Sequence, residues 1–217
     1  MPRPTLTDAS FDLSYARDTA TTLGGPTEPI TDPRCSPYDV GFEMMLDGAQ
    51  VLRLGQDLIV NVAQANHQLG VDWLTRHVDG RFRVWPVHRM ADNHIDSMLL
   101  ALKPGVFLAR HAGLRQMLPA PFQKWQFIVP PEPEPGQFPV YSDEDLLLTS
   151  PYIDINVLSL DEDRVLVNAD CTGLIKKLES EAFTVIPVRH RHRRLYGGGF
   201  HCFTLDTRRA GGAEDYR

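Results

Sequence analysis

The feature that most constrains the fold of this chain is a unit of structure that the sequence predicts three times. Each copy has two short apolar strands joined by a tight turn, followed by a helix and a further strand. A recurring supersecondary unit predicts a repeat architecture, and units that each contain a small sheet and a helix can be arranged around a common axis. The first copy comprises strands at 51–54 and 58–62, a helix at 65–77 and a strand at 82–87.

The second and third copies follow at similar intervals. The hairpin turns contain Gly55, Gly105 and Asp161, which are 50 and then 56 positions apart. Tight hairpins require antiparallel pairs, which disfavours a doubly wound parallel sheet. The second copy comprises strands at 95–102 and 106–109, a short helix at 112–118 and a strand at 125–129. The third comprises strands at 155–160 and 165–168, a helix at 172–181 and a strand at 183–188, and a further strand is predicted at 200–205.

The chain is expected to divide into an irregular segment and a repeat domain. Residues 1–42 are poor in apolar runs and rich in Thr, Asp, Pro and Gly, which favours irregular structure. Residues 43–217 carry the three repeats. Within them, the prolines of 130–139 predict a stiff surface connector.

Composition and charge exclude several classes of function. The hydrophobic fraction of 42% is that of an ordinary globular protein, and the net charge of −6 argues against nucleic acid as a partner. Purely apolar runs are far shorter than the roughly 20 residues of a membrane helix, so no membrane partner is expected. The three cysteines match no dense disulfide framework, and no signal peptide is recognisable at Met1, which together favour the cytoplasm.

Residues capable of chemistry recur at equivalent ends of the repeats. If the repeats surround one axis, these ends point to the same centre. An acid, an imidazole, hydroxyls and a thiol would then meet there, and a cysteine with a distant His and Asp is the usual composition of an activated thiol nucleophile. The candidates are Asp47, His94, Asp96, Thr149, Ser150 and Cys202.

His201 is adjacent to Cys202, but the predicted strand argues against it as the partner of the thiol. Neighbouring side chains of a strand point to opposite faces, so His94 is the preferred partner and His201 is expected to be structural. The three glycines at 197–199 remove side chains beside the thiol, which would let a substrate approach closely.

Two other interpretations of these residues are weaker. His88, His94, Asp96 and Cys202 could supply zinc ligands, but they lack a tight ligand spacing, so no metal is expected. The basic run RHRHRR at 189–194 could contact phosphates, but a solvated loop is the preferred interpretation for a chain of this net charge.

The segment GGGFHCFTLDTRR at 197–209 resembles the active-site segment of the amidinotransferases. Asn-His-Ile-Asp at 93–96 resembles the histidine motif of that family, and Leu-Asp-Gly-Ala at 46–49 resembles its aspartate motif. The resemblance runs in order over nearly the whole chain. It departs at Gln50, where the family usually has a second acid.

The resemblance implies a pentein-type α/β propeller, in which five ββαβ units surround an axis. About three units plus one strand are recognisable here, because family members are much longer on the N-terminal side. The chain is therefore expected to correspond to the C-terminal part of such a protein. It is also expected to be weakly active or inactive alone, and to associate as a homo-oligomer or with an N-terminal partner chain.

The resemblance also implies roles for the candidate residues. Cys202 would be the nucleophile, His94 the general acid and base, and Asp47 the carboxylate that binds the guanidinium group. Asp96 would be a further substrate contact, and Arg110 or Arg115 would bind the carboxylate of the donor. Thr149 and Ser150 match a pair of hydroxyls near the amino-acid end of the donor. The substrates would be small molecules, arginine as donor and an amine as acceptor, with no cofactor.

Two alternatives to amidino transfer stay open at this point. The same Cys, His and Asp set could hydrolyse guanidines with water as the second nucleophile, as in arginine deiminase-like proteins. The chain could also be a truncated, non-catalytic remnant. The acceptor amine stays open between glycine, an inosamine phosphate and other primary amines.

Overall fold

The computed structural model describes residues 44–78, 80–133, 151–207 and 214–216. The predicted irregular segment 1–42, most of the proline-bearing connector and the candidates Thr149 and Ser150 lie outside these residues. The chain forms two compact units, Met1–Ile95 and Asp96–Arg217.

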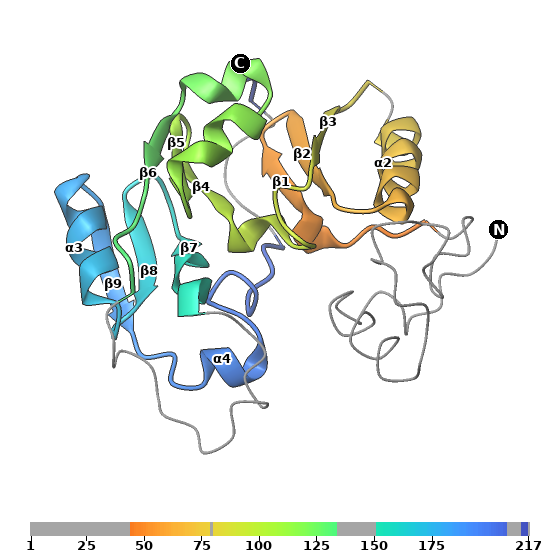
Figure 1. Ribbon diagram of the computed structural model, residues 1–217. Helices are drawn as coiled ribbons and strands as arrows, with labels where there is room; N and C mark the ends of the chain where they lie inside the picture. Colours follow the sequence, from red (N-terminus) through yellow and green to blue (C-terminus); the bar gives the residue numbers. More distant parts are fainter. Residues whose placement is uncertain (1–43, 79, 134–150, 208–213, 217) are drawn as a thin grey trace, which may run out of the picture. The chain divides into compact units, whose positions relative to one another are not determined.

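The first unit contains one complete repeat, in which α2 lies beside a three-stranded sheet (Figure 1). The first two strands are antiparallel, with Val51 opposite Val60, and the third strand runs parallel to the second, with Asp57 opposite Arg83. Every residue of the central strand is buried, and Leu58, Val60 and Val62 share an apolar cluster with Val71 and Val78 of the helix. The elements are η1 (Gly48–Gln50), β1 (Val51–Leu54), β2 (Asp57–Val62), α2 (Ala65–Val78) and β3 (Arg83–His88).

The second unit contains the other two predicted repeats, again as three-stranded sheets with the same topology. The second repeat comprises β4 (Leu99–Lys103), β5 (Val106–Ala109), η3 (Ala112–Met117), η4 (Ala120–Lys124) and β6 (Gln126–Ile128), after η2 (Ile95–Ser97) at the boundary of the units. The third comprises η6 (Pro151–Ile155), β7 (Leu158–Ser159), β8 (Arg164–Asn168), α3 (Thr172–Ser180) and β9 (Thr184–Val188), and α4 (Arg193–Tyr196) follows it. The predicted α/β repeat is confirmed.

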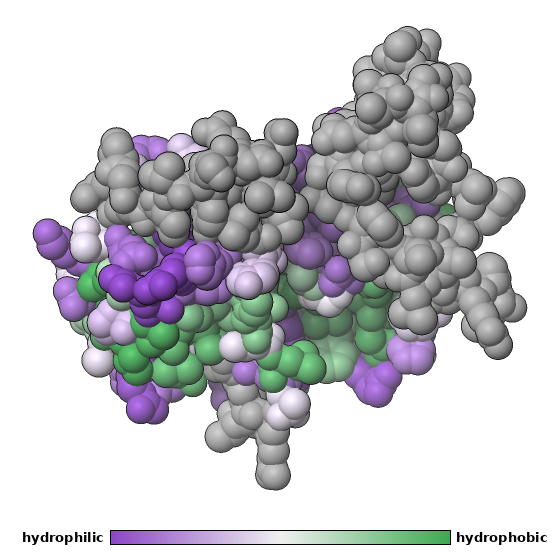
Figure 2. Space-filling view, turned by 90° about the horizontal axis from the view of Figure 1, so that it is seen from below, coloured by the Kyte–Doolittle hydropathy of each residue, from purple (hydrophilic) through white to green (hydrophobic). Residues whose placement is uncertain are grey.

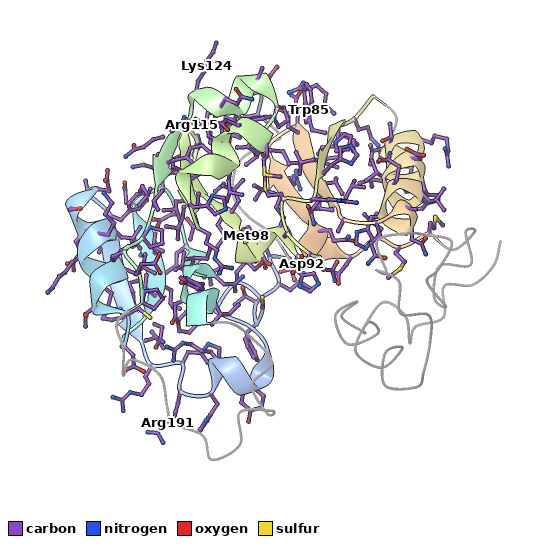
Figure 3. The ribbon with its side chains drawn as sticks, in the orientation of Figure 1. Trp85, Asp92, Met98, Arg115, Lys124 and Arg191 are labelled. Atoms are coloured by element: carbon purple, nitrogen blue, oxygen red, sulfur yellow. The ribbon has the colours of Figure 1, made fainter. Side chains whose placement is uncertain are left out.

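Local chemistry explains where the repeats turn and how their strands are fixed. Gly55 and Gly105 have positive φ angles in the tight hairpin turns, a conformation that side chains disfavour. At the start of the first parallel pair, the fully buried Asp57 accepts hydrogen bonds from Arg83 Nε at 2.7 Å and Nη2 at 2.6 Å. The indole of Trp85, labelled in Figure 3, donates to the same carboxylate at 2.7 Å. The buried charge is thus fully paired, as burial requires.

The structure differs from the sequence-based prediction mainly at the C-terminal end. The predicted strand at 200–205 is a turn, because the backbone N–H groups of His201 and Cys202 bond to Asn156 rather than to a neighbouring strand. The basic run at 189–194 is only partly a solvated loop: it includes the start of α4, where Arg193 is buried. Within the described residues, no helix is long and apolar enough to span a membrane.

Candidate active site

Asp47 is fixed by a reciprocal cap at the start of η1. Its Oδ1 accepts a hydrogen bond from the N–H of Ala49 at 2.9 Å, and its own N–H donates to Gln50 Oε1 at 2.7 Å. This capping box orients the carboxylate without covering it, because about a third of the Asp47 side chain stays exposed. Gln50, which replaces the acid that the family resemblance leads one to expect, therefore acts here as a buried partner of the Asp47 backbone.

His94 contacts Asp47 within the first unit. Its Nε2 donates to Asp47 Oδ2 at 3.1 Å, and this hydrogen bond is the largest of the influences that hold the pKa of Asp47 below its ordinary value. Both side chains are partly exposed, at 41% for His94 and 35% for Asp47, so a ligand can reach them. The structure thus brings two of the candidate residues, Asp47 and His94, into contact.

The loop that leads to His94 is held by one buried asparagine. Asn61 Nδ2 donates to the carbonyl groups of Ala91 at 2.8 Å and Asn93 at 2.7 Å. Its Oδ1 accepts from the N–H groups of Met90 at 3.1 Å and Ala91 at 3.3 Å. A single polar residue in the middle of an apolar strand thus satisfies four backbone groups and fixes the path of the chain into His94.

A second histidine lies near this pair and was not predicted. His67 of α2 is 1% exposed, and its Nδ1 accepts a hydrogen bond from the N–H of Ala63 at 3.2 Å. Burial lowers the pKa of His67 to about 4, although the charge of Asp47 acts in the opposite direction. His67 is therefore neutral at physiological pH. The sequence gave no sign that this helical histidine is buried near Asp47.

In the second unit, one buried carboxylate contacts both His201 and Cys202. His201 Nδ1 donates to Asp96 Oδ2 at 2.8 Å, and the thiol of Cys202 lies 3.6 Å from the same oxygen. The prediction that His201 and Cys202 point to opposite faces of a strand is wrong, because no strand forms there. Among the described residues, Asp96 Oδ1 is buried without a hydrogen-bond partner.

Asn156 positions the backbone of this loop. Its Oδ1 accepts from the N–H of Cys202 at 3.0 Å, and its carbonyl oxygen accepts from the N–H of His201 at 3.3 Å. Its Nδ2 donates to the carbonyl oxygen of Asp96 at 3.3 Å, so one buried side chain connects the carboxylate segment with the thiol segment.

The three glycines before Phe200 have separate structural reasons. Gly197 ends α4 with a positive φ of 76°. A Cβ on Gly198 would come within 2.7 Å of Cys202 Cβ, and a Cβ on Gly199 would come within 2.5 Å of the Asn156 carbonyl oxygen. The glycines therefore make room for the protein's own thiol loop, whereas the sequence-based interpretation gave that space to a substrate.

The surroundings of Cys202 oppose its ionisation. Desolvation raises the pKa of the thiol to about 12, and the negative charge of Asp96 adds to this effect, although the residue as a whole is exposed. Cys202 is thus a neutral thiol in the free protein at physiological pH. A cation bound beside Asp96 would reverse part of this effect, because it would stabilise the thiolate.

The two arginines that compete for the donor carboxylate differ in their contacts. Arg115, labelled in Figure 3, donates to the carbonyl oxygens of Gln123 and Trp125, the latter at 2.9 Å. Arg110 stacks over the ring of Tyr152 at 4.1 Å, and its Nη1 lies 3.8 Å from Met98 Sδ. Arg115 is therefore engaged in holding backbone, which leaves Arg110 as the better candidate.

The predicted residues thus form two described groups, Asp47 with His94 in the first unit and Asp96 with Cys202 in the second. Within residues 44–78, 80–133, 151–207 and 214–216, no three His, Cys, Asp or Glu side chains are grouped as metal ligands. Their placement at equivalent ends of the predicted repeats selected these four residues, and the resemblance supplied the role expected of each.

The chain is similar in sequence to proteins of one kind. It is 34% identical over 213 residues to inosamine-phosphate amidinotransferase 1 of Streptomyces glaucescens, an alignment that covers 94% of this chain and 60% of that protein. It is 33% identical to the L-arginine:L-lysine amidinotransferase of Pseudomonas savastanoi pv. phaseolicola, over 99% of this chain and 55% of that protein. No family model matches the sequence.

The structural comparison agrees with the sequence comparison. The solved inosamine-phosphate amidinotransferase of Streptomyces griseus matches with a TM-score of 0.75 and 31% identity, over all of this chain and 56% of that one. Fold and site together define an α/β repeat protein of the pentein type. The predicted resemblance is confirmed, since the chain is a relative of the amidinotransferases over nearly its whole length. It spans little more than half the length of these relatives.

Proposed function

We propose that this chain carries the catalytic centre of an amidinotransferase. The amidino group of arginine would move to the thiol of Cys202 and then to an acceptor amine, with release of ornithine. The relatives at 33–34% identity support this assignment, and each is an amidinotransferase by name.

The observation that carries the proposal is the state of Asp96. This buried carboxylate has the Cys202 thiol beside Oδ2 and a second oxygen, Oδ1, without a partner among the described residues. A guanidinium group presents a planar fork of N–H donors that a carboxylate accepts in a bidentate manner. A guanidinium bound to Asp96 would satisfy Oδ1 and would place its carbon close to the sulfur.

The proposed first half-reaction begins with the thiol. The bound guanidinium cation would lower the pKa of Cys202, which is about 12 in the free protein, and the proton would be lost to solvent. The thiolate would attack the guanidinium carbon, and the bond from that carbon to the δ-nitrogen of arginine would break. His94 would protonate the leaving amine, and the amidino group would stay on Cys202 as a thiouronium.

In the second half-reaction, His94 would take a proton from the acceptor amine. The amine would attack the thiouronium carbon, and the sulfur would leave as thiolate. Asp47 would orient His94 through their hydrogen bond of 3.1 Å and would bind the guanidinium from its exposed side.

The remaining assignments are parts of the same proposal. Arg110 would bind the donor carboxylate, because the Arg115 side chain already donates to backbone carbonyl groups. Thr149 and Ser150 keep their predicted role near the amino-acid end of the donor. The cytoplasmic location and the association with a second copy or an N-terminal partner chain stay predictions, and mass measurement in solution tests the latter.

The experiment is incubation of the purified chain with arginine, with and without a primary amine. We expect intact mass to show an amidino adduct, peptide mapping to place it on Cys202, and ornithine release to depend on the amine. Cys202→Ala should give neither adduct nor ornithine. Citrulline and ammonia in place of ornithine would show hydrolysis, and turnover by Cys202→Ala at the normal rate would exclude the covalent route.

A further inference from the structure

A buried ion pair precedes the thiol loop in the second unit. Arg193, the first residue of α4, has a side chain that is only 1% exposed. Its Nε lies 2.5 Å from Asp154 Oδ1, and its Nη2 donates to Asp154 Oδ2 at 2.9 Å. The neighbouring Arg191 points away from the ribbon into solvent (Figure 3). Among the arginines of the basic run whose burial is described, Arg193 is the buried one, and Arg189 and Arg191 are exposed.

The other described arginines of the basic run are exposed to solvent, as the sequence predicts for a solvated loop. Figure 2, which views the chain from below Figure 1, shows strongly hydrophilic residues gathered beside hydrophobic ones. Arg189 and Arg191 are exposed. Burial of a charged side chain removes it from water, which costs free energy. The burial of Arg193 therefore needs an explanation that the exposed arginines do not.

The geometry of the pair restricts orientation as well as distance. Two nitrogens of the guanidinium lie against the two carboxylate oxygens, and the contact from Nη2 is a hydrogen bond; an apolar contact or a lysine cannot hold the plane of the group in this way. Arg193 Nη1 also donates to the carbonyl oxygen of His190 at 3.3 Å. Asp154 Oδ1 accepts from Asn168 Nδ2 at 3.2 Å, so the pair connects η6, the end of β8 and the segment after β9.

The same short segment holds both ends of the thiol loop. Asp154 binds Arg193, where the loop begins, and Asn156, two residues later, binds the N–H of Cys202, where it ends. Between them, Gly198 and Gly199 pack without side chains against Cys202 and Asn156. A displacement of α4 would therefore be transmitted to the sulfur through a segment with little freedom to absorb it.

We propose that the Asp154–Arg193 pair is a positioning device that sets the Cys202 thiol against the Asp96 carboxylate. Arg193 and Asp154 are positioning residues, since neither touches the reacting atoms. The catalytic consequence rests on the proposed amidino transfer. The effect on the thiol itself does not, and it can be measured without any turnover.

The test compares Arg193→Met with the unaltered chain. The first readout is the pH dependence of alkylation of Cys202 by iodoacetamide, followed on the peptide that contains this residue. Loss of the pair should let the thiol move from Asp96, so that the alkylation profile shifts to lower pH. The second readout is the rate of amidino adduct formation at saturating arginine, which should fall about 10- to 100-fold, the cost expected for a misplaced reacting group.

Arg164→Met is the matched control. It removes an ion pair of similar length in the same unit, Arg164 Nη2 to Asp161 Oδ2 at 2.5 Å, whose side chains are exposed. We expect its alkylation profile and adduct rate to equal those of the unaltered chain. Arg193→Lys keeps the charge without the fork and should give an intermediate profile.

The outcomes separate the two proposals. A folded Arg193→Met with an unchanged alkylation profile and an adduct rate within twofold would overturn the positioning role. If Arg193→Met does not fold, an unchanged profile for Arg193→Lys overturns it in the same way. Absence of any adduct in the unaltered chain would contradict amidino transfer by this chain on its own, while a shifted alkylation profile would still support the positioning role.

Discussion

In the free protein, the negative charge of Asp96 opposes ionisation of the Cys202 thiol. The carboxylate is nearly fully buried and lies 3.6 Å from the sulfur, so a thiolate there would face a negative charge with little solvent to screen it. This arrangement protects the thiol from adventitious reagents, because only the thiolate is a strong nucleophile. In the proposed reaction, the positive charge of the bound guanidinium offsets the negative charge of Asp96 and stabilises the thiolate. The energy for activating the nucleophile would thus come from binding arginine.

The pH dependence of Cys202 alkylation tests this electrostatic balance. Because the pKa is raised to about 12, the thiolate fraction should rise about tenfold per pH unit from pH 8 to 11 without levelling. Asp96→Asn removes one of the causes of the raised pKa, while burial remains. We therefore expect alkylation of this variant to be faster at pH 8 and to level at a lower pH than in the unaltered chain. Equal rates for the two proteins at every pH would show that the Asp96 charge does not act on the thiol.

At the scale of elements, two of the repeats have an asparagine at the equivalent position of the central strand. Asn61 in β2 and Asn168 in β8 lie opposite Val87 and Val188, each one residue after a valine that faces a proline. Each asparagine bonds to the backbone beyond the third strand, Asn61 at Met90 and Asn168 at His190. These two segments lead to His94 and to the thiol loop. The same strand position in the two repeats thus carries an asparagine that holds the segment after the third strand, which leads to His94 in one repeat and to Cys202 in the other.

The sequence predicts these elements unevenly, for physical reasons. Apolar runs closed by glycine turns predict the three sheets, because a buried strand needs a continuous run and a tight turn needs a positive φ. The helix α4 has only four residues and no apolar period, so it gives no signal. The burial of Arg193 depends on Asp154, which is 39 positions away in sequence. The contacts of Asp96 with His201 and Cys202 are likewise long-range, and a strand prediction placed these two neighbours on opposite faces.

Asn61→Ala tests the role of the asparagine in the first repeat. The change leaves four backbone groups of the loop before His94 without partners, and each unsatisfied buried group costs about 1–3 kcal/mol. We expect the amide hydrogens of Met90 and Ala91, which donate to Asn61 Oδ1, to exchange at least about 10-fold faster. Gln68→Ala, which removes only an exposed side-chain contact with Asp72, should leave their exchange unchanged. Unaltered exchange in Asn61→Ala would show that the loop is held by other contacts.

At the scale of the whole molecule, the proposed chemistry divides between the two compact units. The Asp47–His94 pair belongs to the first unit, and the Asp96–Cys202 pair belongs to the second. Each unit has its own apolar core. In the proposed reaction, Asp47 and Asp96 would both bind the guanidinium group of arginine. The proposal therefore predicts an effect of arginine that extends over the whole chain.

Hydrogen exchange of Cys202→Ala, with and without arginine, measures that effect. This variant cannot form the covalent adduct, so arginine acts only as a ligand, and at 100 times its Kd it should stabilise the regions that bind it by about 2.7 kcal/mol. We expect slower exchange both in residues 90–94 of the first unit and in 198–203 of the second. Adding Asp47→Ala should weaken the protection in both regions, because one carboxylate that binds the guanidinium is lost. Citrulline, which lacks the positive charge, should protect neither. Protection by arginine confined to the second unit would show that Asp47 and His94 take no part in binding the donor.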